Sequence, residues 1–273
     1  MAPTIWGLNL GEMKWGKFKS SYMFGNKDYH LRRTKFIVYQ LALIFTVVSE
    51  SLGTSALSNY VDEQKLVQKL NPSAYNYNND YVGAASFNIF AGVFTAFIFG
   101  AAFFFDLFWP MRHEDRGIRI AWKGCGVASV VFVLASALEL TIITARNSGY
   151  VDGVSPSEAE ELLRQYKKYS ITPLRYKDNG RALAAVVFVW LGFVFTFASC
   201  VILFYSIDNA EKGPGPLTAH ARAAEMAQTD PHRDPEAAYA MDESEDSAEK
   251  AHNTAPEGAA ADMPREPTPA ATN

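Results

Sequence analysis

Two long apolar stretches in the middle of the chain limit what it can fold into. Residues 82–108 and 124–145 each contain a single carboxylate, Asp106 in the first and Glu139 in the second. A helix needs about 20 apolar residues to cross roughly 30 Å of hydrocarbon, and both stretches exceed that length. The segment between them, residues 109–116, is too polar for lipid. The sequence therefore predicts two membrane-spanning helices joined by a short charged turn.

Two further apolar stretches flank this pair and complete the predicted fold. We expect an all-α integral membrane protein, a four-helix transmembrane bundle within residues 36–207. Its spans are predicted at residues 36–57, 82–108, 118–145 and 182–207. Because the apolar face of each helix can be buried only against lipid or another helix, four such spans predict a bundle.

The two ends of the chain differ strongly in charge. Residues 1–35 form an arm rich in basic and aromatic residues, whereas residues 208–273 form an acidic tail. Within 213–273 there are twelve acidic and four basic residues, a net charge of −8. This part is also rich in Ala, Pro, Ser and Thr and cannot bury a core, so we expect the tail to be disordered.

Basic residues near the first span predict the orientation. Arg32, Arg33 and Lys35 directly precede it. Lys and Arg that flank a span stay cytosolic, and the first span usually dominates. With four spans both termini share a side, so we predict that both are cytosolic, in the plasma membrane or an endomembrane of the secretory pathway. The arm itself fits two alternatives: a solvated cytosolic segment, or a segment that recognises anionic lipid.

The two loops on the other side have distinct signals. In residues 58–81 we expect a short interfacial helix that stops at Asn71-Pro72, followed by a tyrosine-rich turn. In residues 146–181, Ser155 and Glu158 form a capping box with proline at the first helical position. This signal predicts a helix from about Pro156 to Tyr169.

Three polar residues within the spans are candidate functional residues. Glu50, Asn88 and Glu139 each lie six or seven residues from the outer end of their span, so all three are expected at a depth of roughly 10 Å. No Lys or Arg lies in the core of any span. One interpretation is that neutral carboxylic acids hydrogen-bond to Asn88, Ser51 or Ser136 and hold the helices in register. The other is a proton or cation site, since acids inside a membrane mark such pathways.

Small residues recur on the same helices and predict where the helices approach closely. On the second span they follow Asn88 at every fourth position, and the fourth span offers a similar set. The predicted packing seam consists of Gly92, Ala96, Gly100, Gly192 and Thr196.

Several classes of protein are excluded by what the sequence lacks. There is no HExxH, GxSxG, P-loop or histidine box, and the five histidines lie outside the spans, so we expect no enzyme, no cofactor and no metal site. No basic helix or aromatic RNA-binding motif indicates a nucleic-acid partner. Cys125 and Cys200, the only cysteines, fall in apolar stretches, which argues against a disulfide-linked ectodomain.

The architecture resembles a known group of membrane proteins. The features are four spans, short cysteine-free loops, a polar tail, and the sequences Phe-Phe-Phe-Asp-Leu-Phe-Trp-Pro at 103–110 and Arg-Ile-Ala-Trp-Lys at 119–123. Over residues 36–208 the chain resembles MARVEL-type four-span proteins and uncharacterised fungal tetraspan membrane proteins. This resemblance implies membrane organisation, trafficking or a scaffold role through lateral association, in a homo-oligomer or with other membrane proteins. The alternative hypothesis is a channel or transporter subunit that uses Glu50 and Glu139.

The predicted orientation can be tested by protease accessibility. In sealed, right-side-out vesicles the protease should cleave only within residues 58–81 and 146–181, because the bilayer shields the cytosolic arm and tail. Fragment sizes on a gel, read with antibodies to each terminus, measure this. Detergent-opened vesicles provide the control, and loss of the tail from intact vesicles would contradict the orientation.

Overall fold

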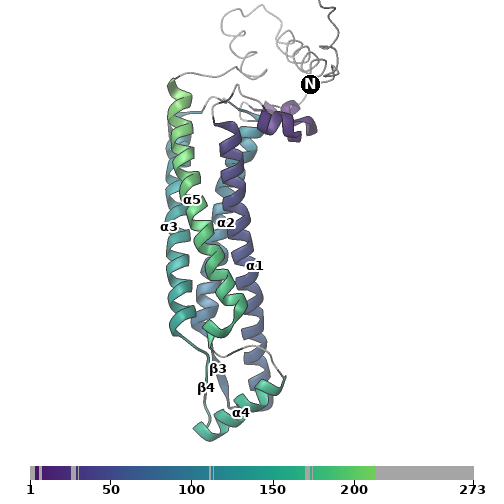
Figure 1. Cartoon of the computed structure of the whole chain (residues 1–273), viewed down its shortest axis with the longest axis vertical. Coiled ribbons are helices and arrows are strands. Elements are labelled where there is room, and N and C mark those ends of the chain that lie inside the picture. The colour runs from purple at the N-terminus through teal and green to yellow at the C-terminus, as the bar shows by residue number, and fades with distance from the viewer. Residues whose placement is uncertain are drawn as a thin grey trace, which may run out of the picture. The chain divides into compact units, whose positions relative to one another are not determined.

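The described part of the chain forms one compact unit dominated by four long helices. The computed structural model describes residues 4–5, 8–25, 29, 31–110, 112, 114–169, 173 and 175–212, all within the unit Met1–Pro216. The long helices are α1 (Arg32–Leu70), α2 (Asn79–Phe108), α3 (Arg116–Arg146) and α5 (Gly180–Lys212), which lie side by side (Figure 1). Each is long and apolar enough to cross a membrane, which confirms the prediction of four such helices.

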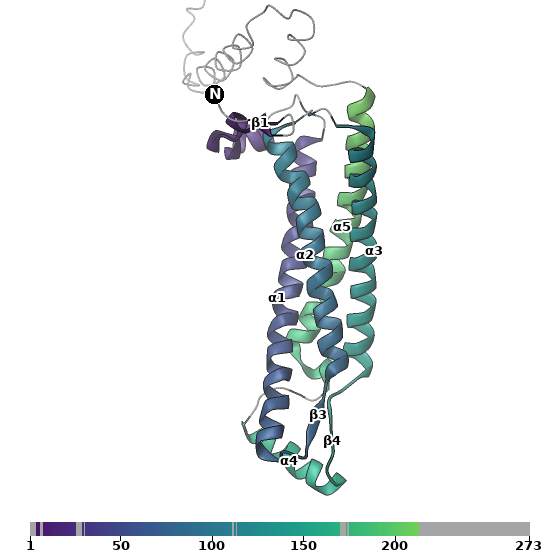
Figure 2. The same cartoon turned by 180° about the vertical axis from the view of Figure 1, so that it is seen from behind.

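The helices run alternately in opposite directions. The start of α1 and the end of α5 lie at one end of the bundle, which we call the terminal end, and the opposite end is the loop end (Figures 1 and 2). Helix α1 packs against α2 and α5, and α3 packs against the same two helices. Short connections between antiparallel neighbours favour this up-and-down arrangement. Helix α5 continues to Lys212, past the predicted boundary at residue 207, and the rest of the tail lies outside the described residues.

Helix α1 is longer than the sequence indicates. It runs without interruption through residues 58–70, where we expected a loop with a separate interfacial helix. This segment contains no glycine or proline, and Tyr60, Glu63 and Val67 are buried along one face. Buried contacts at helical spacing therefore stabilise the extension although its sequence is polar. The helix ends at Leu70, directly before Asn71-Pro72, as the proline predicts.

The two loops at the loop end form one structure. Strand β3 (Tyr75–Tyr77) pairs with antiparallel strand β4 (Tyr150–Asp152), and the rings of Tyr77 and Tyr150 stack with centroids 5.3 Å apart. Helix α4 (Pro156–Tyr169) follows, in the predicted place. Its capping box is formed: the Ser155 N–H donates to the Glu158 carboxylate at 3.2 Å, and the Glu158 N–H donates to the Ser155 hydroxyl at 3.4 Å.

A tyrosine cluster closes the bundle beneath these strands. The rings of Tyr60, Tyr81 and Tyr176 lie within 5.1 Å of one another, and Tyr176 belongs to the short helix η4 (Tyr176–Asp178). The Tyr176 hydroxyl donates to the Asp80 carboxylate at 2.7 Å. Burial, followed by the Asp80 carboxylate, raises the pKa of Tyr176, so its hydroxyl remains protonated and keeps this role as a donor.

The described part of the arm packs on the terminal end instead of extending into solvent. It contains two short strands, β1 (Thr4–Ile5) and β2 (Leu8–Asn9), and three short helical segments, η1 (Leu10–Glu12), η2 (Trp15–Phe18) and η3 (Ser21–Gly25). Leu8, Leu10, Tyr22 and Met23 pack against a buried cluster around Phe36 and Leu107. The arm is therefore part of the folded unit.

Candidate functional site

One hydrogen-bond network joins all four long helices, and Asn88 lies at its centre. The Asn88 amide donates to the Ser49 hydroxyl of α1 at 3.1 Å, and the Ser136 hydroxyl of α3 donates to the Asn88 carbonyl at 3.0 Å. The Ser49 hydroxyl in turn donates to the main-chain carbonyl of Ala185 in α5 at 2.9 Å. All three polar side chains are buried. We call this set the polar network.

The polar network satisfies groups that could not find water in a membrane. A hydroxyl can donate one hydrogen bond and accept others, so Ser49 links the amide of Asn88 to the backbone of α5. A buried amide or hydroxyl without a partner costs roughly 1–3 kcal/mol, whereas hydrogen bonds between helices in a membrane contribute about 0.6–2 kcal/mol each. The network therefore favours one register of the four helices over registers that would separate these groups.

We expected Glu50 and Glu139 to hydrogen-bond to Asn88, Ser51 or Ser136. Instead, Asn88 bonds to Ser49 and Ser136, and Ser51 bonds to the Val47 carbonyl of its own helix at 2.8 Å. Successive residues on a helix point about 100° apart, so Ser49 and Glu50 cannot both face Asn88. The pattern that identifies Ser49 is the stripe of small or polar residues on the buried face of α1, Ala42, Thr46, Ser49, Gly53 and Ala56.

Glu50 instead lies against the backbone of α2. A Cβ atom placed on Gly92 would overlap the Glu50 carboxyl group, so the absence of a side chain at Gly92 creates the space that Glu50 occupies. One carboxylate oxygen of Glu50, Oε1, is buried and has no hydrogen-bond partner among the described residues. Glu139 is half-buried on α3, one turn beyond Ser136, and is not part of the polar network.

Two of the three glycines in the predicted seam lie against a neighbouring helix. At Gly192 a Cβ would lie 3.0 Å from the Thr46 methyl group and 3.4 Å from the Thr46 backbone nitrogen, so α5 approaches α1 closely there. Gly92 allows the contact with Glu50 described above. At Gly100 a Cβ would meet no atom within 4 Å. Ala96 is half-buried, and Thr196 is buried with its hydroxyl unpartnered among the described residues.

Charged residues inside the bundle are concentrated at the terminal end. The Asp106 carboxylate lies between the Lys35 ammonium at 2.8 Å and the Arg112 guanidinium at 3.3 Å. Lys35 also donates to the Ser206 hydroxyl at 3.0 Å, so this cluster links α1, α2 and α5. Arg112 follows Asp106 by six residues, so it is within reach along the chain. Lys35 lies far away in the sequence, on another helix, so its contact with Asp106 could not be read from neighbouring residues.

Arg32 holds the arm to the start of α1. Its guanidinium carbon lies 4.5 Å from the ring centre of Tyr22 and 5.1 Å from those of Tyr29 and Phe36. The side chain is buried, and its nitrogens make no hydrogen bond to a described residue. Cation–π attraction to three ring faces therefore compensates the buried charge.

Replacing Asn88 with leucine should destabilise the bundle. The Ser136 hydroxyl would lose its interhelical acceptor, and Ser49 its interhelical donor, while the branching of the side chain and its number of heavy atoms stay the same. We expect a loss of about 1–2 kcal/mol in the free energy of unfolding, measured by reversible unfolding in mixed detergent micelles. Ser51→Ala is the matched control and should be neutral, because its hydroxyl bonds only within α1. Equal stability of Asn88→Leu and wild type would contradict a registering role for the network.

Gly92→Ala should also destabilise the bundle, because the new methyl group displaces the Glu50 side chain. Overpacking of this kind costs roughly 1–3 kcal/mol. Combining it with Glu50→Ala should recover most of the loss, since the overlapping atoms are then gone. Gly100→Ala on the same helix is the control, and the open space there predicts no loss of stability. The same unfolding assay measures all variants, and failure of the double variant to recover would show that Glu50 is not the obstacle.

Comparison with known proteins does not assign the chain to a family. No protein-family model, no curated protein and no solved structure matches it. The resemblance to MARVEL-type proteins therefore stays a prediction from architecture. The function has to be inferred from the helices, the polar network and the surfaces of the bundle.

Proposed function

We propose that this chain is a non-enzymatic, multi-pass membrane protein that organises its membrane, or proteins trafficked in it, through lateral helix association. Four helices of the required length and apolarity support the membrane placement. In the proposed orientation the terminal end, with the arm and the start of the tail, is cytosolic. The architectural resemblance to MARVEL-type proteins implies a role of this kind in membrane organisation or trafficking.

The observation that carries this proposal is the polar network. Its hydrogen bonds are directed from helix to helix, and its central amide has both its oxygen and its nitrogen engaged by serine side chains. Ser49 and Ser136 bring no ionisable group to it. Such a network holds the four helices together from inside the bundle, so the outer surface remains available for contact with lipid or other proteins.

The outer surface is apolar along all four long helices. Large side chains at least two-fifths exposed lie on every one of them, where lipid or a partner helix would cover them. They include Ile44, Val47, Phe90, Val93, Phe97, Val131, Leu138, Val187, Val194 and Phe197. Phe97 is 73% exposed, so α2 offers a large aromatic side chain for contact with another membrane protein or a second copy. These faces support lateral association as the mode of action.

A second candidate function rests on Glu50. Its buried oxygen without a described partner is the kind of group that binds a proton or a cation in a membrane transporter. In that hypothesis Glu50, together with Glu139 in an oligomer, would line a conduction path. Transport would require the ionisable group itself, whereas a structural role would need only its shape.

Flux measurements on the full chain in sealed vesicles separate the two functions. We expect no proton or cation flux above that of protein-free vesicles, for the wild type and for Glu50→Gln and Glu139→Gln alike. Glutamine keeps the shape of a protonated carboxyl group, so the variants should insert normally. Flux in the wild type that both variants lose would overturn the organising role and establish transport.

The same vesicles report on lateral association. Copies labelled at the tail with donor and acceptor fluorophores should show energy transfer above the level for random mixing at the same lipid dilution. Transfer at the random level would exclude self-association and leave other membrane proteins as the partners.

A further inference from the structure

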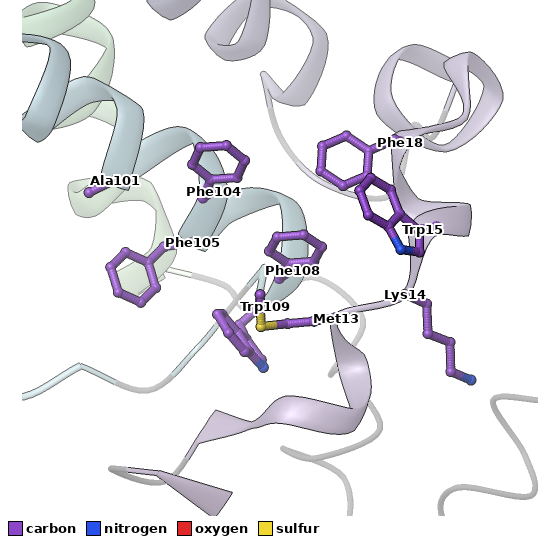
Figure 3. Close-up of a pocket in the computed structure, with 9 residues that line it drawn as sticks. All are labelled: Met13, Lys14, Trp15, Phe18, Ala101, Phe104, Phe105, Phe108 and Trp109. Carbon is purple, nitrogen blue, oxygen red and sulfur yellow. The ribbon is translucent and has the colours of Figure 1, made fainter. Parts of the chain in front are cut away.

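An aromatic pocket lies between the arm and the end of α2 (Figure 3). Its volume is about 440 Å³, within the usual range of ligand pockets. Met13, Trp15 and Phe18 form one wall, and Phe104 and Phe108 form part of the other. Ala101, two turns before the end of α2 and about 10 Å from Phe108, also lines the pocket. The pocket therefore runs along the helix from its end toward the middle of the bundle.

The walls are held in place by contacts outside the pocket. The Lys17 ammonium donates to the main-chain carbonyl of Phe108 at 2.7 Å, where the helix has no further N–H to offer. The Phe18 ring meets the Phe108 ring edge to face, with centroids 5.6 Å apart. This fixes η2 beside the last turn of α2. The small side chain at Ala101 leaves the deeper part of the pocket open.

The chemistry of the lining is divided between an apolar interior and one cation. Rings and the Met13 side chain form the interior, and Lys14 is the only charged residue among the lining residues. In Figure 3 the Lys14 side chain extends away from the rings, so its ammonium lies outside the apolar space. It is exposed and makes no ion pair with a described carboxylate. Trp15 is 88% exposed and Phe104 49%, so the pocket opens to the surroundings of the helix.

We propose that this pocket binds one acyl chain of an anionic phospholipid, with the lipid phosphate at Lys14. The inference rests on the proposed membrane placement, in which the end of α2 lies at the headgroup level and Ala101 lies in hydrocarbon. An acyl chain matches the apolar, elongated space, and an anionic headgroup matches the unpaired ammonium at its rim. The bound lipid would fix the arm to the bilayer and give the protein a preference for anionic membrane regions.

The acidic tail is a poorer occupant than lipid. Its charge would suit Lys14, but residues 213–273 contain a single aromatic residue, Tyr239, and no continuous apolar stretch to fill a space lined by rings. A zwitterionic phospholipid would fill the interior and also bring a phosphate to Lys14, but its own ammonium group already balances that charge, so it should bind more weakly than an anionic lipid.

Quenching of tryptophan fluorescence by brominated lipid tests the proposal, because Trp15 and Trp109 line the pocket. The full-length chain is reconstituted in phosphatidylcholine vesicles that contain a minor fraction of either phosphatidylserine or phosphatidylcholine with brominated acyl chains. Wild type should be quenched more strongly by the brominated phosphatidylserine. Ala101→Phe fills the pocket and should remove this difference. Ala121 is an exposed alanine of α3 at the same end, so Ala121→Phe should keep the difference.

The Lys14 variants test the role of the charge. Lys14→Gln should lower the apparent affinity for phosphatidylserine about fivefold, and Lys14→Arg should preserve it.

The outcomes distinguish failure of this inference from failure of the membrane placement. Flotation with the vesicles is measured on every sample. Chain that does not float overturns both. Inserted chain that is quenched equally by the two lipids has no anionic preference, and unchanged quenching in Ala101→Phe places the lipid elsewhere; either result overturns the inference alone. Stronger quenching after removal of residues 217–273 would identify the tail as the occupant and would also overturn it.

Discussion

The Asn88 side chain is buried and has no water to bond, so its position determines which groups must surround it. Its two serine partners come from α1 and α3, and Ser49 extends the chain of hydrogen bonds to the backbone of α5. Lipid tails are as apolar as leucine, so in a membrane apolar packing alone would favour one register of the helices only slightly over another. The directional hydrogen bonds at Asn88 select a single register. Small residues then allow the close approach: a Cβ on Gly192 would come within 3.0 Å of the Thr46 methyl group of α1.

The terminal end is held by a different kind of interaction. Asp106 is shared by two cations, and the Arg32 guanidinium is covered by three rings, so charge is neutralised or screened within the folded unit. Removing one member of such a cluster leaves a buried charge, which is more costly than never having placed it there. The Lys123–Asp208 pair at 2.5 Å joins α3 to α5 at this end. In the proposed membrane placement this end would lie at the headgroup level, where water and phosphate share the charge, and Asn88 would lie deeper, where hydrogen bonds between neutral groups are suitable.

Local signals in the sequence predicted the helices well, and interactions between distant segments poorly. The four apolar stretches, the capping box at Ser155 and the stop at Pro72 are each contained within a few residues, so they could be read directly. The extension of α1 could not, because its polar sequence is helical through contacts of Tyr60, Glu63 and Val67 with other elements. The β3–β4 ladder has only three pairs, too few to show an alternating pattern.

The candidate site also depends on contacts between distant segments, which the sequence predicted poorly. Equal depth within the predicted spans selected Glu50, Asn88 and Glu139, and of these three the polar network contains Asn88 alone. Depth says nothing about rotation around the helix axis. Charge made Glu50 conspicuous, although the neighbouring Ser49 lies on the face that meets Asn88. The buried stripe on α1 contains this information, since small and polar residues recur there every three or four positions.

The strand pairing between the two loops also has a consequence for biogenesis. Tyr77 precedes α2 and its partner Tyr150 follows α3, so the ribosome must deliver both intervening helices before the ladder can close. Until then β3 presents unpaired backbone groups, which can pair with other strands. Closure of this small ladder therefore marks the moment at which the helical hairpin between the strands has reached its final position.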